Sequence, residues 1–274
     1  MNEVTQPPID VFGLTDSGRV RTSNEDHFVI ATLRKAVELR FSSLSESRAR
    51  GSLREASAQL LVVADGVGGR PGGEYASELT VQTLLEFITQ AAGCFQAFDV
   101  DKEQQFLERM EQAVQHSHDL IRKEHGPRGH APSTTLTMIT LIWPRAYLVH
   151  AGDSRAYWLH RGRLRPLTQD QTMGEFMVDA GAWTEEMAAR AKTAGTLTSA
   201  VGASELTPTI GLADLERGDT LLLCTDGLTK HVPDDRIAAV LGGTGGAEMA
   251  CRELVNAALA SGGTDNVTAI VARC

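Results

Sequence analysis

Hydrophobic positions along this chain repeat at two different spacings, one typical of strands and one typical of helices. Short apolar runs bounded by turn residues predict strands, and 10–33 holds two of them around a turn at 16–18. The other predicted strands cover 59–64, 134–143, 146–150, 155–160, 220–225 and 267–272. Apolar residues at intervals of three and four predict amphipathic helices. These helices cover about 76–88, 103–125, 234–241 and 246–260.

The order of these elements indicates the fold class. Strands come first, then two helices, more strands, an insertion over 169–205, one strand, two helices and a last strand. This order lacks the strict alternation of a doubly wound parallel sheet. Strands joined by tight turns, as at 161–163, and helices in pairs favour antiparallel sheets covered by helical layers. The polar stretch 34–58 is predicted to be a surface excursion.

Composition narrows the possible partners. The formal net charge of −9 argues against nucleic acid, because no basic excess is available to displace counterions from phosphate. The N-terminal segment lacks the pattern of a signal peptide, and the apolar runs are too short to span a bilayer. The four cysteines form no Cys-x-x-Cys pair, which argues against zinc. We therefore expect a cytoplasmic protein that binds neither membranes nor nucleic acid.

Four aspartates stand beside predicted strands in a repeated context. Asp65 and Asp226 each follow a buried strand and precede glycine, Asp153 lies between two strands, and Asp265 opens the last strand. In an antiparallel sheet one strand ends beside the start of its neighbour, so we expect Asp65, Asp226 and Asp265 to meet on one sheet edge. Clustered carboxylates need a neutralising cation, and oxygen-only ligands favour Mg²⁺ or Mn²⁺. Asp-Gly is also a common turn signal, so at this point a metal site and a set of ordinary turns both remain open.

A fifth segment, 16–26, carries Arg21, Glu25 and Asp26. One interpretation is a charged hairpin loop. The other is a phosphate-binding arginine with two carboxylates beside it.

Taken together, the motifs resemble the metal-dependent protein phosphatases of type 2C, the PPM family, and most of all its short bacterial members. The segments that carry the resemblance occur in the family's order and span about 10–272. They are 21–26, 64–69, 133–135, 152–155, 167–170, 225–228 and 265–268. The resemblance implies an α+β fold of two packed antiparallel β-sheets flanked by pairs of helices, with a metal centre between the sheets. It also implies one catalytic domain over 1–274, with 169–205 as a flap beside the active site.

The resemblance further implies two core Mg²⁺ or Mn²⁺ ions and a weaker third. Asp65 would bridge the two core ions, and Gly66 would offer its carbonyl to one of them. Asp226 and Asp265 would hold the other. Asp153, together with Asp226, would match the third site.

The remaining implied roles belong to the loop before the second strand. Glu25 and Asp26 would orient metal-bound water, and Arg21 would bind the substrate phosphate. The implied reaction is hydrolysis of phosphoserine and phosphothreonine on proteins, opposing a serine/threonine kinase. Two alternatives are an inactive phosphoprotein-binding module of the same fold and a phosphoesterase for small molecules. Because every core aspartate and Arg21 are present, the sequence favours the enzyme.

Three positions depart from the family pattern. Val67 stands where many eukaryotic members have a histidine offered as the general acid. The flap begins with Gln171 and Thr172 after Asp170, where many relatives have His and Ser. Lys230 replaces a frequent acidic residue four positions after Asp226, which puts the affinity for the third ion in question.

Overall fold

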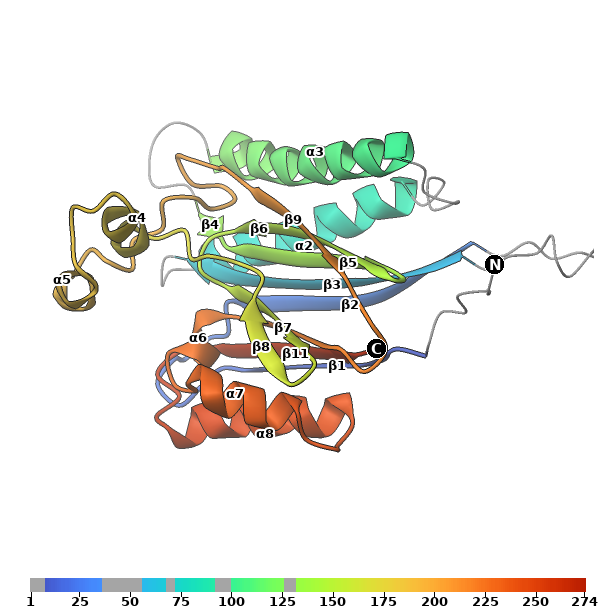
Figure 1. The fold of residues 1–274 in the computed structure, drawn as a ribbon. Helices are drawn as coiled ribbons and strands as arrows, with labels where there is room; N and C mark the ends of the chain where they lie inside the picture. The colour runs from blue at the N-terminus through green and yellow to red at the C-terminus, as the bar shows by residue number, and fades with distance from the viewer. Residues whose placement is uncertain (1–7, 36–55, 68–71, 92–99, 126–131) are drawn as a thin grey trace, which may run out of the picture.

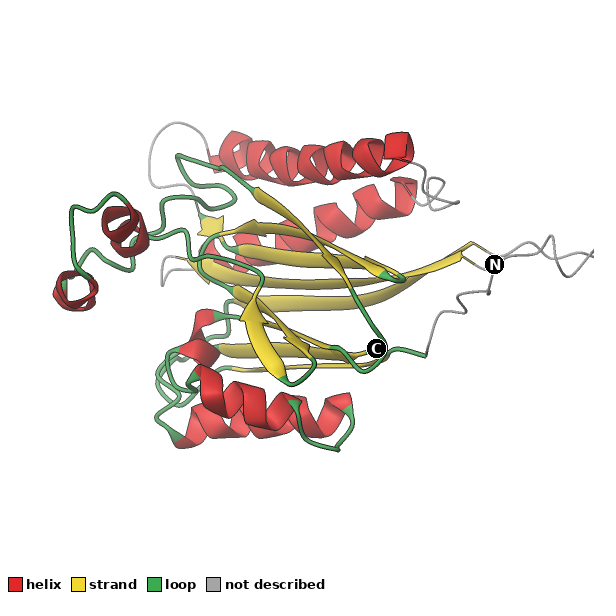
Figure 2. Cartoon of the chain, viewed as in Figure 1, coloured by secondary structure: helices red, strands yellow, loops and turns green. Residues whose placement is uncertain are grey.

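The protein is a sandwich of two antiparallel β-sheets with helices on both outer faces (Figures 1 and 2). The computed structural model describes residues 8–35, 56–67, 72–91, 100–125 and 132–274. The fold class predicted from the sequence is confirmed. Most of the predicted excursion at 34–58 lies outside the described residues.

One sheet has five strands in the order β1-β11-β10-β7-β8. In chain order these are β1 (Asp10–Asp16), β7 (Arg155–His160), β8 (Arg163–Pro166), β10 (Thr220–Cys224) and β11 (Val267–Arg273). Every residue of β10 is buried, because this strand is covered on both faces. We call this the five-stranded sheet.

The other sheet has the order β2-β3-β5-β6-β9, and the short β4 pairs with β3. Its strands are β2 (Asp26–Lys35), β3 (Ala56–Val67), β4 (Ser133–Thr134), β5 (Leu136–Ile142), β6 (Arg145–Ala151) and β9 (Thr209–Asp214). The single strand predicted over 134–143 is therefore divided at Thr135, which donates its backbone N–H to the carbonyl of Asp65 instead. We call this the six-stranded sheet.

The helices cover the outer faces of the two sheets. α2 (Gly72–Ala91) and α3 (Val100–His125) cover the six-stranded sheet, while α7 (Asp234–Leu241) and α8 (Ala247–Ala260) cover the five-stranded sheet (Figure 1). The short α6 (Asp226–Thr229) follows β10. α4 (Met173–Asp179) and α5 (Glu185–Arg190) lie within the segment 169–205 and project from one end of the sandwich. No helix in the described ranges is both long and apolar enough to cross a membrane.

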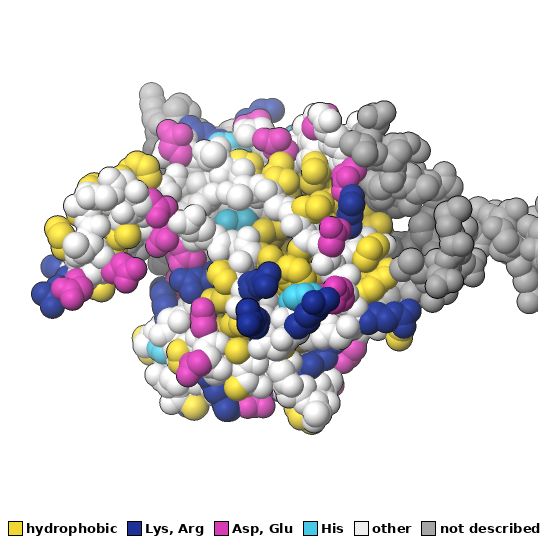
Figure 3. All heavy atoms as spheres, viewed as in Figure 1, with side chains coloured by type: hydrophobic (Ala, Val, Ile, Leu, Met, Phe, Trp, Pro, Cys, Tyr) yellow, Lys and Arg dark blue, Asp and Glu magenta, His cyan; other side chains and the backbone are white. Residues whose placement is uncertain are grey.

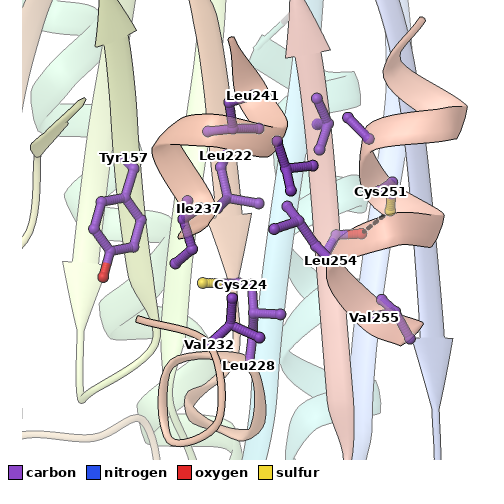
Figure 4. Close-up of a cluster of buried hydrophobic side chains, with 14 of the residues drawn as sticks. Tyr157, Leu222, Cys224, Leu228, Val232, Ile237, Leu241, Cys251, Leu254 and Val255 are labelled. Carbon is purple, nitrogen blue, oxygen red and sulfur yellow. Dashed lines mark hydrogen bonds between the residues drawn. The ribbon is translucent and has the colours of Figure 1, made fainter. Parts of the chain in front are cut away.

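Three buried clusters fill this layered structure. One lies between α2, α3 and the six-stranded sheet, one between the two sheets, and one between the five-stranded sheet and the helices α7 and α8 (Figure 4). Burial of apolar side chains in these layers is the main stabilising term of the fold.

Strand β9 was not predicted from the sequence, because its large residues point outward. Ile210 and Leu212 are exposed, while the small Ala213 belongs to the buried layer between the sheets. A Cβ at Gly211 would lie 3.2 Å from the side chain of Leu148, so a larger residue there would require that side chain to shift.

Candidate metal centre

The predicted site aspartates lie at one end of the sandwich, but they come from both sheets. Asp65 lies within β3 of the six-stranded sheet, whereas Asp226 follows β10 and Asp265 precedes β11 in the five-stranded sheet. The expectation that all three meet on one sheet edge is therefore wrong. The order of strands along the chain does not reveal which strands share a sheet, and the two sheets face each other here.

Asp26 connects the two sheets. It is the register partner of Asp65 across the β2–β3 pair, so two carboxyl groups lie directly opposite each other. Thr225 and Thr268 of the five-stranded sheet donate hydroxyl hydrogen bonds of 2.8 and 2.6 Å to Asp26 Oδ2. Burial raises the pKa of Asp26 to about 7, although these two hydroxyl groups oppose the shift.

Asp65 is anchored by its main chain. Its N–H donates to Thr135 Oγ1, and its carbonyl accepts hydrogen bonds from the N–H of Thr135 and the hydroxyl of Thr134. Burial, followed by the charges of Asp26 and Asp226, raises the pKa of the Asp65 carboxyl well above its usual value. The side chain is thus held in place where negative charge is poorly tolerated without a cation.

Gly66 and Glu25 meet where β3 enters the centre. The N–H of Gly66 donates to the carbonyl of Glu25 at 3.1 Å. A Cβ on Gly66 would lie 2.4 Å from the main chain of Gly73 and 2.8 Å from that same carbonyl, so only glycine fits. The N–H of Glu25 is held by Asn266 Oδ1 at 2.9 Å.

Asp153 lies in the tight loop between β6 and β7. Gly152 before it has a φ of 110°, and a Cβ there would lie 2.7 Å from Thr135. Burial, and then the charge of Asp226, raises the pKa of Asp153 to about 7. The loop is tied to the start of the segment 169–205, because Gln171 donates its N–H to the carbonyl of Gly152 at 2.7 Å.

Two side-chain cations occupy the space around Asp226 and Asp265. Lys230 Nζ lies 2.5 Å from Asp226 Oδ2 and 3.1 Å from Asp265 Oδ2. Arg21 forks onto Asp265, with Nε 2.9 Å from Oδ1 and Nη2 3.1 Å from Oδ2. Burial alone would raise the pKa of Asp265, but the hydrogen bonds and charges of Arg21 and Lys230 outweigh it and lower the pKa. Burial raises the pKa of Asp226 even though Lys230 opposes the shift.

In this conformation no three carboxylate, imidazole or thiolate side chains of the described residues are arranged as a complete metal site. In the same conformation, Lys230 pairs with Asp226 and Asp265, and Arg21 pairs with Asp265. Two buried carboxylate oxygens, Asp26 Oδ1 and Asp226 Oδ1, nevertheless have no hydrogen-bond partner. Buried carboxylates with unused oxygens fit hard divalent cations such as Mg²⁺ and Mn²⁺.

Two groups of positioning residues were not assigned roles from the sequence. The first is the hydroxyl pair that holds Asp26, Thr225 and Thr268. The second is Asn266, whose Nδ2 donates to the carbonyls of Ser17 and Ser23. All three residues stood inside recognised motifs beside the aspartates, so the signal was present but their function was not apparent.

A family model described as "Protein phosphatase 2C" matches residues 49–242, more than two thirds of the chain. The chain belongs to the protein phosphatase 2C family. The resemblance stated from the motifs is thereby confirmed.

Individual family members agree with this placement. The serine/threonine protein phosphatase PstP of Mycobacterium tuberculosis is 36% identical over 219 residues, which cover 79% of this chain and 40% of that protein. The chain thus spans less than half the length of this relative. A serine/threonine phosphatase structure from S. agalactiae has a TM-score of 0.77 at 25% identity and covers 97% of this chain and 99% of that one.

A third comparison bears on the metal centre. The catalytic domain of PstP, solved in complex with two manganese ions, has a TM-score of 0.72 at 30% identity, with 97% of both chains covered. The two ions in that structure support the metal dependence predicted for this family member.

Proposed function

We propose that this chain is a protein serine/threonine phosphatase that uses divalent cations to hydrolyse phosphoserine and phosphothreonine. The observation that carries the proposal is the imbalance of charge between the two sheets. Six carboxyl groups surround the centre, and two side-chain cations of the described residues, Arg21 and Lys230, form ion pairs with Asp226 and Asp265. The carboxyl groups are those of Glu25, Asp26, Asp65, Asp153, Asp226 and Asp265.

The same residues are proposed to hold two core Mg²⁺ or Mn²⁺ ions. Asp65 would bridge the two ions, the Gly66 carbonyl would ligate one, and Asp226 and Asp265 would ligate the other. Asp153 and Asp226 would form a weaker third site. When bound, the ions supply an activated water and offset the charge on the phosphoryl oxygens. Lys230 would have to leave its position between Asp226 and Asp265 to admit an ion there.

Arg21 is proposed to bind the substrate phosphate. Its side chain is 45% exposed, and its guanidinium group already holds a carboxylate in the forked geometry that also suits a phosphate. Once Asp265 turns to a metal ion, the fork becomes available to the substrate. Glu25 and Asp26 would orient the attacking water, with Asp26 held by Thr225 and Thr268.

The extent of the domain and its cellular setting are also proposals. We propose that 1–274 forms one catalytic domain with a core over about 10–272 and a flap over 169–205. Phosphoprotein substrates, a cognate serine/threonine kinase and a cytoplasmic setting are supported by the family and by the expectations drawn from composition. The acidic net charge continues to argue against nucleic acid.

The decisive experiment measures hydrolysis of p-nitrophenyl phosphate, phosphopeptides and sugar phosphates in EDTA, Mg²⁺ and Mn²⁺. We expect no turnover in EDTA, recovery with either metal, and a preference for phosphopeptides. Asp65→Asn should lower kcat by at least about a hundredfold, because it removes a charged ligand. Full activity in EDTA would contradict the metal-dependent mechanism. Metal binding without turnover would identify a binding module, and a preference for sugar phosphates would identify a small-molecule phosphoesterase.

A further inference from the structure

A cavity of about 380 Å³ lies on the β7–β8 hairpin, away from the aspartates, and is lined by His160, Arg161, Arg163 and Arg165. Figure 3 shows a group of Lys or Arg side chains beside a histidine near the middle of the visible face, over the position of β8 in Figure 1. Four basic residues around one hollow are unusual in a chain whose net charge is −9. The mechanism proposed above uses none of them.

The histidine of this cavity is held in a defined orientation. His160 Nδ1 lies 2.9 Å from Oδ1 of Asp219, whose side chain is only 3% exposed. The second carboxylate oxygen of Asp219 accepts the N–H of Glu216 at 2.7 Å, so the carboxylate is itself held in place. Among the described residues, His160 Nε2 has no hydrogen-bond partner.

Two of the three arginines are also held in place around the hollow. Arg161 pairs through Nη2 with both carboxylate oxygens of Glu216, at 2.8 and 2.9 Å. The guanidinium carbon of Arg165 lies 6.0 Å from the centre of the Trp158 ring. Arg163 is exposed and has no ion pair with any described residue. At least one guanidinium group is therefore free to bind an anion.

The turn between the two strands has an unusual residue choice. Arg161 and Gly162 have φ values of 50° and 75°, the pattern of a two-residue hairpin turn that favours Asn or Gly at both positions. An arginine in the left-handed region is strained, and strained residues occur preferentially at functional positions. The turn places Arg161 at the tip of the hairpin, where it lines the cavity.

We propose that this cavity, which we call the basic hairpin site, binds an anionic segment of a protein substrate. Guanidinium groups recognise paired anionic oxygens, which a second phosphorylated residue or a cluster of Asp and Glu would supply. A peptide fits better than a small anion because β8 is the outermost strand of its sheet and leaves one edge open to an extended chain. The inference deepens the proposed protein phosphatase function and rests on it.

The separation of the two sites fits one extended substrate segment. Strand β7 runs from Arg155, two residues after Asp153, to His160. At about 3.3 Å per residue, the basic hairpin site lies roughly 20 Å from the Asp153 loop. A peptide of about six to eight extended residues would span that distance. The site would hold the substrate by its acidic segment while the phosphorylated residue reaches the metal centre.

The test compares two phosphopeptides with the same phosphoserine, one of which carries a tail of four glutamates eight residues away. Arg163→Glu should raise KM for the tailed peptide by at least about fivefold, with kcat unchanged. It should leave the untailed peptide and p-nitrophenyl phosphate unaffected. Lys123→Glu makes the same change of charge on the exposed face of α3 and is the matched control. A third peptide, with phosphoserines in place of the glutamates, distinguishes phosphate from carboxylate as the preferred anion.

A second measurement does not depend on turnover. Calorimetric titration of the unphosphorylated tailed peptide should show binding to the wild type, and Arg163→Glu and Arg165→Glu should each weaken that binding several-fold. Equal KM effects on tailed and untailed peptides, or an equal effect of Lys123→Glu, would overturn the proposal. If the wild type does not hydrolyse p-nitrophenyl phosphate, this result would instead contradict the proposed function.

Discussion

At the scale of single residues, the centre is shaped by buried carboxyl groups whose pKa values are shifted in opposite directions. Asp26, Asp65, Asp153 and Asp226 all have raised pKa values, whereas Asp265 has a lowered one. The difference arises because Asp265 is the carboxylate that both Arg21 and Lys230 contact. Lys230 thus acts as an internal counter-ion for Asp226 and Asp265. This is the structural consequence of having a lysine where the family frequently has an acidic residue.

Replacing Lys230 by methionine should tighten metal binding. The variant keeps a long side chain but removes the ammonium that contacts Asp226 and Asp265. Because Lys230 is about half exposed, we expect a gain in Mn²⁺ affinity of about tenfold, near the low end for a hydrogen bond to a charged group. Isothermal titration calorimetry measures this directly. Lys230→Arg keeps the charge and should bind Mn²⁺ like the wild type, and unchanged affinity in Lys230→Met would contradict the counter-ion role.

The raised pKa values predict a pH dependence of stability in the metal-free protein. Asp26 and Asp153 have pKa values of about 7 in the folded state, against about 4 in the unfolded chain. The folded state therefore binds more protons between these values. The free energy of unfolding contributed by these two groups falls as pH rises from about 4 through about 7. Thermal unfolding in chelator across this range measures the effect.

Saturating Mn²⁺ provides the control, because bound cations favour the ionised carboxylates and should abolish this loss of stability. Metal binding at pH 6 should also release protons, which calorimetry in two buffers of different ionisation enthalpy detects. A metal-free protein that gains stability over the same range would show that these two carboxyl groups do not dominate the pH response.

At the scale of elements, the site depends on how closely the ends of strands approach one another. Gly227, in the first turn of α6, lies against the start of β11, and a Cβ there would sit 1.9 Å from the carbonyl oxygen of Asn266. This contact brings Asp226 and Asp265 together from two elements. Asn266 in turn holds the loop before β2 through three hydrogen bonds.

Gly227→Ala should therefore damage both the fold and the centre. The added methyl group meets main-chain atoms that have no alternative position, so we expect a loss of about 2–4 kcal/mol in the free energy of unfolding. Mn²⁺ affinity should fall as well, because Asp226 and Asp265 move apart. Urea denaturation and metal titration measure the two effects. Gly195→Ala is the control, since a Cβ at Gly195 meets nothing within 4 Å and should be tolerated.

At the scale of the whole molecule, the buried sandwich contrasts with the projecting segment 169–205, which is proposed above to be a flap. This segment carries two short helices, of which α5 has no buried residue and α4 buries only Gly174. Phe176 and Met187 are 59% and 51% exposed. The base of the flap is different, because Asp170 forms a forked ion pair of 2.7 and 2.8 Å with Arg155 of β7.

Hydrogen exchange should distinguish the segment 169–205 from the sandwich. Amides of α4 and α5 have few buried contacts and should exchange at least about a hundredfold faster than those of β10 and β11, which open only with the core. Exchange followed by mass spectrometry resolves these segments. Equal protection of α5 and β10 would show that the flap is as stable as the sheets.

Asp153→Ala tests whether the third ion and the flap act together. The variant removes a buried carboxyl group with a raised pKa, so it should fold normally and keep two tightly bound ions. We expect a large loss of turnover on phosphopeptides, accompanied by faster exchange at the base of the flap. Calorimetric metal titration and steady-state kinetics measure the outcome. If the variant is unfolded, or if its phosphopeptide turnover is unchanged, then Asp153 serves only to form the loop.

The family, the fold class and the position of nearly every helix and buried strand could be predicted from the amino-acid pattern. Burial in layers imposes a periodic pattern on the residues of each helix and strand. The residues close to the aspartates lie in short, local segments that can be recognised in the sequence. Strand β9 was not predicted, because its large side chains face outward and its inner residues are the small Gly211 and Ala213. Helix α6 was not predicted, because its four residues are too few to show the hydrophobic period of a helix.

The pairing of the charged groups, in contrast, depends on the tertiary structure. Asp26 and Asp65 lie opposite each other by strand register, Asp265 precedes a strand of the other sheet, and Lys230 at the end of α6 contacts both Asp226 and Asp265. The basic hairpin site likewise depends on Asp219, which is 59 positions from His160 in the chain. Such contacts join residues that are distant in sequence. Their energies depend on burial and on distances of a few ångströms, and neither is encoded in the spacing of residues along the chain.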